Sequence, residues 1–331
     1  LIIGLLCGIA LAFLREYMDI TVKTQEEVEQ ELGLTFLGIV PSIGSRSSRK
    51  GRYYGYYGAK RKGKRGEKKP KEKEEEAPVN KDLFVFENPK SSVAECVRAV
   101  RTNILFMAAQ NPIKNVLITS PAPQEGKTTM GISLAITMAQ SGNRTLIIDA
   151  DMRRPRVHKA FDLPGKSGLS SAIMGMDPLS KVICKTRVEN LDVLPCGPIP
   201  PNPAEILHTR RFADIMAELG LIYDRIVIDS PPVIAVTDAV ILSTICDGVI
   251  LVFRPLSTQK SAARQAKRQI QDVNGKILGV VFNDLDLENK SYGYYHYYYS
   301  RKYGYYQRYE TDSSEDIKAD SKDDYSIANE P

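Results

Sequence analysis

The sequence is poor in the residues that build disulfide frameworks and metal centres. Its 331 residues include five cysteines, three histidines and no tryptophan. No two cysteines form a Cys-x-x-Cys pair, and the histidines have no ligand spacing (Cys7, Cys96, Cys184, Cys196 and Cys246; His158, His208 and His296). This scatter indicates reduced thiols and argues against a structural zinc site. The length suffices for one large α/β domain with additional segments.

Long uncharged apolar runs are also scarce, and the clearest one covers residues 1–14. As a helix it would span about 21 Å, short of the roughly 30 Å hydrocarbon core of a bilayer. No initiator Met or basic region precedes it, which argues against a signal peptide. A buried core helix is one interpretation. We favour the end of a truncated transmembrane helix over residues 1–18, because Arg15, Lys23 and a later basic block follow on one side.

This interpretation attaches the chain to the cytoplasmic (inner) membrane, with the residues after about 18 in the cytoplasm. A juxtamembrane segment at 19–41 is expected to hold a short helix capped by Thr24 and a strand over 34–41. Residues 42–82 are rich in Gly, Ser, Lys, Arg and Glu and cannot form a core, so we expect a disordered linker. Its basic half is suited to a solvated tether or to anionic lipid, and we expect no nucleic-acid partner.

A strand-like run at 116–119 leads through a Pro-rich turn into GKTT at 126–129 and a helix with apolar periodicity. Strand, tight loop, Gly-Lys-Thr and helix together are typical of a phosphate-binding loop. Backbone N–H groups and the helix dipole favour an anion there. Lys127 is suited to the β/γ-phosphates and Thr128 to Mg²⁺. Pro121 stands where the first glycine is usual, and an ordinary helix start is the alternative.

Alternating apolar runs and helical patterns fill the rest of the folded part. Strands are expected at 144–148, 191–194, 225–228, 249–253 and 278–282, and helices near 168–174, 203–219, 237–245 and 258–273. This alternation predicts an α/β fold with a doubly wound, mostly parallel sheet covered on both faces. Ligands of such sheets bind beyond the carboxyl ends of the strands.

Three carboxylates follow two of these expected strands. Asp149 and Asp151 come after one strand and Asp229 after another. A single Asp in this position is usually a turn residue. Three that converge with Lys127 are suited to hold Mg²⁺ directly or through water.

Two further patterns lie outside this crevice. Glu95, Arg98 and Arg101 share one face of a helix expected from Ser92 to about 109, which by itself is typical of a solvated surface with helical ion pairs. Residues 291–331 form an expected mobile tail that contains ten closely spaced tyrosines (Tyr292, Tyr294, Tyr295, Tyr297, Tyr298, Tyr299, Tyr303, Tyr305, Tyr306 and Tyr309). Phosphate acceptor, stacking surface for single-stranded nucleic acid and sticky low-complexity segment are the open interpretations of the tail.

Taken together, these features resemble the bacterial tyrosine kinases (BY-kinases) of the type fused to a polysaccharide co-polymerase. The resemblance covers about 15–40 and 90–310. The stretch ITSPAPQEGKTT resembles the Walker A loop of this family. LIIDADMRRP resembles its second Walker motif, and VIDSPP resembles its Walker B motif. Glu95, Arg98 and Arg101 match its oligomerisation motif, Glu-x-x-Arg-x-x-Arg. PPNPAEIL at 200–207 and the terminal tyrosine cluster are also similar. Gln124 stands where these kinases more often carry Gly.

The resemblance implies a kinase domain of the P-loop NTPase type over residues 83–290, with ATP and Mg²⁺ as cofactors. The implied nucleotide-binding residues are Pro123, Gln124, Glu125, Gly126, Lys127, Thr128 and Thr129, with Asn283 near adenine. Lys127 would neutralise phosphate charge and Thr128 ligate Mg²⁺. Asp149 would act as base or positioner for the attacking phenol, while Asp151 and Asp229 hold the metal through water.

The implied function is that of a membrane-anchored protein-tyrosine autokinase that transfers the ATP γ-phosphate to its own ten tail tyrosines. Phosphorylation in trans within a ring-like homo-oligomer, held by Glu95, Arg98 and Arg101, is expected. The implied partners are the polysaccharide polymerisation and export machinery, whose chain length it would regulate, and a tyrosine phosphatase. Alternatives are a partitioning-type ATPase switch and a nucleotide-gated scaffold. The switch usually has an extra lysine where this sequence reads Pro121-Ala122-Pro123.

Overall fold

The structure is a computed structural model. It describes residues 2–4, 6, 8, 19–43, 80–107 and 113–286. The predicted tail tyrosines and most of the predicted linker and transmembrane helix lie outside the described residues. Among the described residues, no helix has the length and apolar character needed to cross a bilayer.

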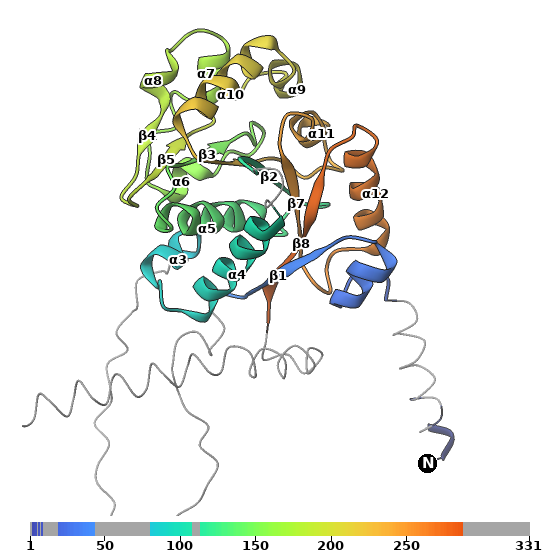
Figure 1. The fold of residues 1–331 in the computed structure, drawn as a ribbon. Coiled ribbons are helices and arrows are strands. Elements are labelled where there is room, and N and C mark those ends of the chain that lie inside the picture. Colours follow the sequence, from blue (N-terminus) through green and yellow to red (C-terminus); the bar gives the residue numbers. More distant parts are fainter. Residues whose placement is uncertain are drawn as a thin grey trace, which may run out of the picture.

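An eight-stranded sheet lies at the centre of the described chain (Figure 1). Its strands follow the spatial order β1-β8-β7-β2-β6-β3-β5-β4. All neighbouring pairs are parallel except β4 and β5. The strands are β1 (Phe36–Pro41), β2 (Asn115–Thr119), β3 (Thr145–Asp149), β4 (Cys184–Lys185), β5 (Leu191–Leu194), β6 (Arg225–Asp229), β7 (Gly248–Phe253) and β8 (Ile277–Leu285). The mostly parallel sheet predicted from the sequence is therefore confirmed.

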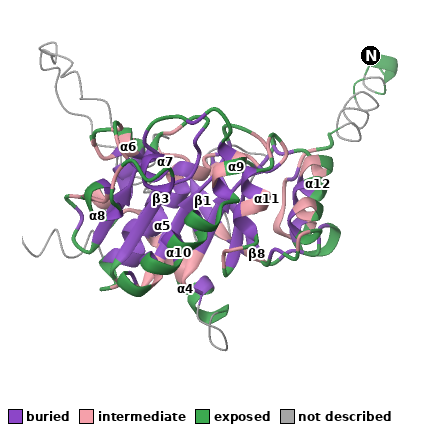
Figure 2. Cartoon of the chain, turned by 90° about the horizontal axis from the view of Figure 1, so that it is seen from above, coloured by how far each residue is buried: buried purple, intermediate pink, exposed green. Residues whose placement is uncertain are grey.

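Helices cover both faces of the sheet, and the strand residues alternate between two cores. Val116 and Ile118 of β2 face the core under α4 (Ser92–Met107) and α5 (Lys127–Gln140). Leu117 faces the other core, which includes residues of α10 (Arg210–Ile222), α11 (Asp238–Ser243) and α12 (Lys260–Gln271). Figure 2 shows the strands buried and the outer helices partly exposed. The remaining helices are η1 (Glu27–Glu31), η2 (Lys81–Leu83), α3 (Phe84–Glu87), α6 (Val157–Ala160), α7 (Leu169–Ile173), α8 (Leu179–Val182) and α9 (Pro203–Leu207).

Two predicted boundaries differ from the structure. The single helix expected over 203–219 is wrong, because α9 and α10 are separate and Thr209 caps α10 by accepting a hydrogen bond from the Phe212 amide (3.3 Å). The linker expected to run through residue 82 ends earlier. Asn80 caps η2, and Asp82 is buried, because both have partners in the folded part.

The segment at 19–43 contributes the edge strand of the sheet and also contacts α12, where Lys267 donates to the Leu32 carbonyl (2.6 Å). Its strand β1 pairs with β8, and the Ser42 amide donates to the Leu285 carbonyl (3.0 Å). Ahead of β1, the amide of Val22 donates to the Thr258 carbonyl (2.8 Å), in the loop that follows β7. The hydroxyl of Thr24, the expected cap, accepts from the Glu27 amide (3.3 Å), but the cap position of η1 itself is Glu26, which makes no side-chain cap hydrogen bond. The juxtamembrane segment is thus part of the sheet.

Candidate active site

The phosphate-loop motif lies between β2 and α5, and its backbone has an unusual conformation. Gly126 has φ +86°, and a Cβ there would lie 1.9 Å from Nδ2 of Asn283. Because side chains are disfavoured in the left-handed region and no space is left, this position requires glycine. Gln124 also has a positive φ (+66°), at the position where the resembling kinases more often carry Gly.

Lys127 is the first residue of α5 and points into a cluster of carboxylates. Its Nζ lies 2.8 Å from Oδ2 of Asp151 and 3.8 Å from Oδ1 of Asp229. Thr128 donates its hydroxyl to Oδ2 of Asp229 (2.7 Å). Burial alone would lower the pKa of Lys127, but the carboxylates of Asp229 and Asp151 raise it. The ammonium group is therefore held charged beside the loop.

Asp149 is fully buried at the end of β3. Its Oδ2 accepts from the amides of Arg156 and Val157 (both 3.0 Å), and its Oδ1 has no hydrogen-bond partner among the described residues. Burial, followed by the charge of Asp229, raises the pKa of Asp149 to about 8. Burial also raises the pKa of Asp229, against the pull of Lys127. The four predicted catalytic residues thus lie in one cluster, because β2, β3 and β6 are neighbours in the sheet.

The cluster fits a magnesium ion. Among the residues that the structure describes, Oδ1 of Asp149 and of Asp229 are buried without a hydrogen bond, and one lysine faces the three carboxylates. A hard divalent cation prefers such oxygen ligands. Within the described part of the chain, no three acidic, His or Cys side chains could hold a metal by themselves. Further ligands would have to come from a nucleotide and from water.

Several predicted nucleotide-binding residues use their side chains to hold the loop itself. Asn283, expected near adenine, donates from Nδ2 to the carbonyl of Glu125 (3.1 Å). The Glu125 carboxyl turns beneath the loop, where it accepts from the Ala122 amide (2.9 Å) and from the hydroxyl of Thr258. Burial raises the pKa of Glu125 to about 7. Pro123 lines a pocket of about 220 Å³ together with Asp151.

Three residues that support the site, Asp82, Arg153 and Asp238, were not predicted from the sequence. Asp82 accepts from the hydroxyl of Thr129 (2.6 Å) and pairs with Arg156 (2.7 Å), so it braces both the start of α5 and the segment after Asp149. Arg153 forms a bidentate pair with buried Asp238, with both N–O distances 3.0 Å. Asp82 follows a highly charged run, and no local signal sets it apart.

The predicted oligomerisation residues lie on α4 and make contacts within the chain. Arg98 pairs with Glu95 and donates to the Pro89 carbonyl. Arg101 donates to the carbonyl of Thr137 on α5 (2.5 Å). All three side chains are half-buried, so part of each remains accessible. Their role between subunits stays a prediction.

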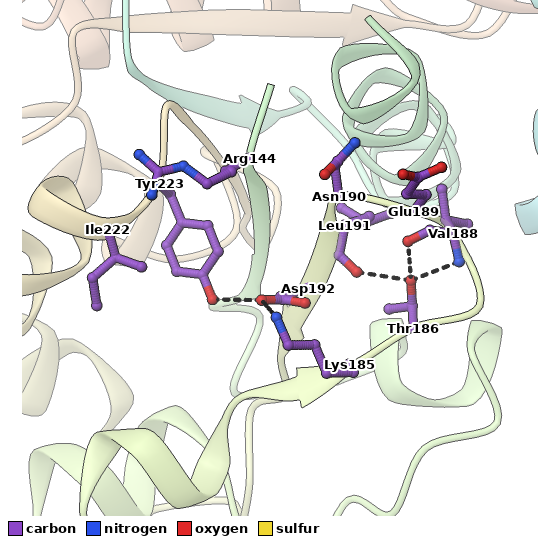
Figure 3. Close-up of a pocket in the computed structure, with 10 residues that line it drawn as sticks. All are labelled: Arg144, Lys185, Thr186, Val188, Glu189, Asn190, Leu191, Asp192, Ile222 and Tyr223. Carbon is purple, nitrogen blue, oxygen red and sulfur yellow. Dashed lines mark hydrogen bonds and ion pairs between the residues drawn. The ribbon is translucent and has the colours of Figure 1, made fainter. Parts of the chain in front are cut away.

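A further pocket, of about 360 Å³, lies at the opposite end of the strands (Figure 3). Tyr223 donates its hydroxyl to Oδ2 of Asp192, and Lys185 donates to the same oxygen (both 2.8 Å). Burial raises the pKa of Tyr223. Because Asp192 is near the amino end of β5, this network is separate from the carboxylate cluster.

Comparisons with known proteins agree with the geometry. A family model described as an AAA domain matches residues 124–277. The putative tyrosine-protein kinase CapB of Staphylococcus aureus is 45% identical over 216 residues, which cover 65% of this chain and 94% of CapB. The crystal structure of the chimerical protein CapA2B2 matches with a TM-score of 0.66 and 35% identity, over 80% of this chain and all of that one. The kinase domain of Escherichia coli tyrosine kinase ETK also gives a TM-score of 0.66, with 29% identity over 80% of this chain and 95% of that domain. The chain therefore belongs to the bacterial tyrosine-protein kinases.

Proposed function

We propose that this chain is a membrane-anchored tyrosine autokinase that transfers the γ-phosphate of Mg-ATP to the tyrosines of its own tail. The observation that carries the proposal is the convergence of Lys127, Asp149, Asp151 and Asp229 at a phosphate-binding loop. In a purely structural cluster, each buried carboxylate oxygen would have its own hydrogen-bond partner. Here two buried oxygens have no hydrogen-bond partner among the described residues.

The residues divide the work of phosphoryl transfer. The amides at the start of α5 and the Lys127 ammonium bind the β- and γ-phosphates. Thr128, Asp151 and Asp229 would hold Mg²⁺, which supplies charge neutralisation on the phosphates. The bond between the γ-phosphorus and the β-bridging oxygen breaks, a bond to the phenol oxygen forms, and ADP leaves. The transition state is loose, so positioning outweighs basicity for a phenol with a pKa near 10.

Asp149 is suited to position the phenol. Its Oδ2 is fixed by two amides, which leaves Oδ1 available to an incoming hydroxyl. With its pKa raised to about 8, Asp149 would be mostly protonated near neutral pH and would not accept a proton. A bound divalent cation would oppose this rise. The geometric role of Asp149 therefore carries more weight than its basicity.

The tail leaves from the same end of the sheet as the phosphate loop, since both follow the carboxyl ends of parallel strands. Tyr292 lies six positions beyond Asp286, a reach of about 20 Å when extended, and the later tyrosines reach farther. The acceptors can thus enter their own site or that of a neighbour. We propose transfer in trans within a ring-like homo-oligomer that uses Glu95, Arg98 and Arg101. Its partners would be the polysaccharide polymerisation and export machinery and a tyrosine phosphatase.

The test mixes two full-length chains with Mg-ATP. One carries Lys127→Met and keeps its tail; the other is active and has its ten tail tyrosines replaced by Phe. We expect phosphotyrosine on the Lys127→Met chain in the mixture and none when that chain is alone. Its thermal unfolding serves as the control for folding. Phosphotyrosine on Lys127→Met alone would refute the site. ATP hydrolysis without any phosphotyrosine in the wild type would instead support an ATPase switch.

A further inference from the structure

A basic groove lies next to the carboxylate cluster. It has a volume of about 790 Å³, and the residues that line it include Arg154, Arg156, His158 and Lys159 from the segment after β3, with 197–199 on the other side. None of the described residues that line it is acidic. A groove with one sign of charge attracts a ligand of the opposite sign.

Two of these cations are available to a ligand. Arg156 is paired with Asp82. Burial, followed by the charge of Lys159, lowers the pKa of His158, which favours its neutral ring. Arg154 and Lys159 are exposed, and neither side chain has an ion-pair partner among the residues that the structure describes. The free positive charge of the groove therefore comes from these two side chains.

The groove is continuous with the catalytic cluster. Arg154 also lines the pocket that contains Pro123 and Asp151, and its amide donates to Oδ1 of Asp151 (3.0 Å). The amide of Arg156 donates to Asp149. A peptide whose tyrosine lies at Asp149 would therefore have its neighbouring residues beside Arg154 and Lys159.

The chain contains a segment of matching charge directly after its last clustered tyrosine. Tyr309 is followed by a stretch, residues 310–324, in which acidic side chains far outnumber Lys318 and Lys322 (Glu310, Asp312, Glu315, Asp316, Asp320, Asp323 and Asp324). The residues before Tyr309 include basic ones, such as Arg301, Lys302 and Arg308. With about 3.3–3.6 Å per extended residue, Glu310 and Asp312 would lie within roughly 10 Å of a tyrosine in the site.

We propose that the basic groove docks the acidic segment 310–324 and thereby selects the tyrosines next to it, Tyr309 first, as phosphate acceptors. The inference rests on the proposed kinase function and adds to it a substrate class, tyrosines followed by acidic residues. Exposed ion pairs are weak, so two cations are expected to change the preference roughly three- to tenfold. The effect should diminish with added salt.

The experiment compares two peptides as substrates of the full chain, in which the ten clustered tail tyrosines are changed to Phe and the seven acidic residues of 310–324 to Asn or Gln, so that the chain's own segment does not compete for the groove. One peptide has the sequence of residues 303–316 with Tyr303, Tyr305 and Tyr306 as Phe; the other also has its acidic residues as Asn or Gln. The measured quantity is the ratio of their kcat/KM values. We expect the unmodified groove to prefer the acidic peptide, and the double variant Arg154→Ala, Lys159→Ala to lose that preference. The matched control, Arg211→Ala with Lys181→Ala, removes two exposed cations elsewhere and should keep it.

A charge reversal makes the test independent of lost folding. The variant Arg154→Glu, Lys159→Glu should prefer a third peptide whose acidic residues are Lys. Equal rates on the first two peptides with the unmodified groove would overturn the docking proposal. A preference for the acidic peptide that survives in the double variant would also overturn it, and would assign the attraction to the basic segment after Arg46. A preference seen only when the peptide already carries phosphotyrosine would also overturn it. Absence of phosphate on every peptide and on the wild-type tail would refute the kinase function itself.

Discussion

Replacement of Gly126 by Ala tests the contact that fixes the phosphate loop. The new Cβ would lie 1.9 Å from Nδ2 of Asn283, so this side chain must move and lose its bond to the Glu125 carbonyl. The left-handed conformation costs a residue other than glycine about 1–2 kcal/mol, and the smaller entropy of the unfolded chain returns about 0.5–1 kcal/mol. A buried amide without its partner adds about 1–3 kcal/mol. We expect a total loss of roughly 2–3 kcal/mol.

The Asn283→Ala background separates these contributions. Without the amide, the Cβ at position 126 has space, and the hydrogen bond is already absent. The cost of Gly126→Ala should then fall to the conformational part, below about 1.5 kcal/mol. The difference is the coupling energy of a double-mutant cycle, measured by urea unfolding of the four chains without nucleotide. Equal costs in the two backgrounds would show that Asn283 does not press on the loop.

Three more changes test other features. Glu125→Gln should flatten the pH dependence of stability. The folded chain keeps a proton on Glu125 up to about pH 7, whereas the unfolded chain loses it near pH 4.5, so the free energy of unfolding of the wild type should fall by up to about 3 kcal/mol as the pH rises across that window. Urea midpoints of wild type and variant that do not differ in this way would contradict the burial of this carboxyl. The triple alanine variant of Glu95, Arg98 and Arg101 should have a lower oligomeric mass in light scattering and less phosphorylation between subunits. Arg101→Ala alone is the control for the contact of Arg101 with α5. Unchanged mass and activity in the triple variant would make the motif a surface feature. Gln124→Gly should raise the urea midpoint of unfolding slightly. The strain of a positive φ at a non-glycine residue, about 1–2 kcal/mol, exceeds the cost of the larger entropy that glycine gives the unfolded chain. A clearly lower midpoint would mean that the Gln124 side chain supports the loop.

The local parts of the site could be predicted from the sequence. A strand, a tight loop and Gly-Lys-Thr specify the phosphate loop within a few residues, and the place of Asp149 and Asp229 follows from the rule that parallel strands carry their ligands at one end. The convergence of the carboxylates with Lys127 was predicted for this reason, and the structure has it.

The supporting contacts could not be predicted, because they join distant parts of the chain. Asp82 and Thr129 are 47 residues apart, and Glu125 and Thr258 are 133 residues apart. Charge composition placed Asp82 in the linker, whereas tertiary packing buries it. The resemblance implies that Asn283 lies near adenine, and this role stays a prediction. Its amide also contacts the loop backbone, a contact that depends on β8 lying close to the loop between β2 and α5.

The attachment of residues 20–22 beside the loop after β7 has an electrostatic consequence. If an anchor precedes Asp19, as proposed, it joins the protein at the end of the sheet where nucleotide binds. An anionic leaflet has a surface potential of about −30 mV, which lowers the local concentration of a doubly charged anion such as Mg-ATP by roughly tenfold close to the lipid. The basic segment 46–73 follows in the sequence a few residues after Ser42, whose amide donates to the Leu285 carbonyl, and its charge would oppose that depletion. Under the proposed anchoring, this charge would favour the supply of nucleotide to a site that would otherwise lie in a region poor in anions.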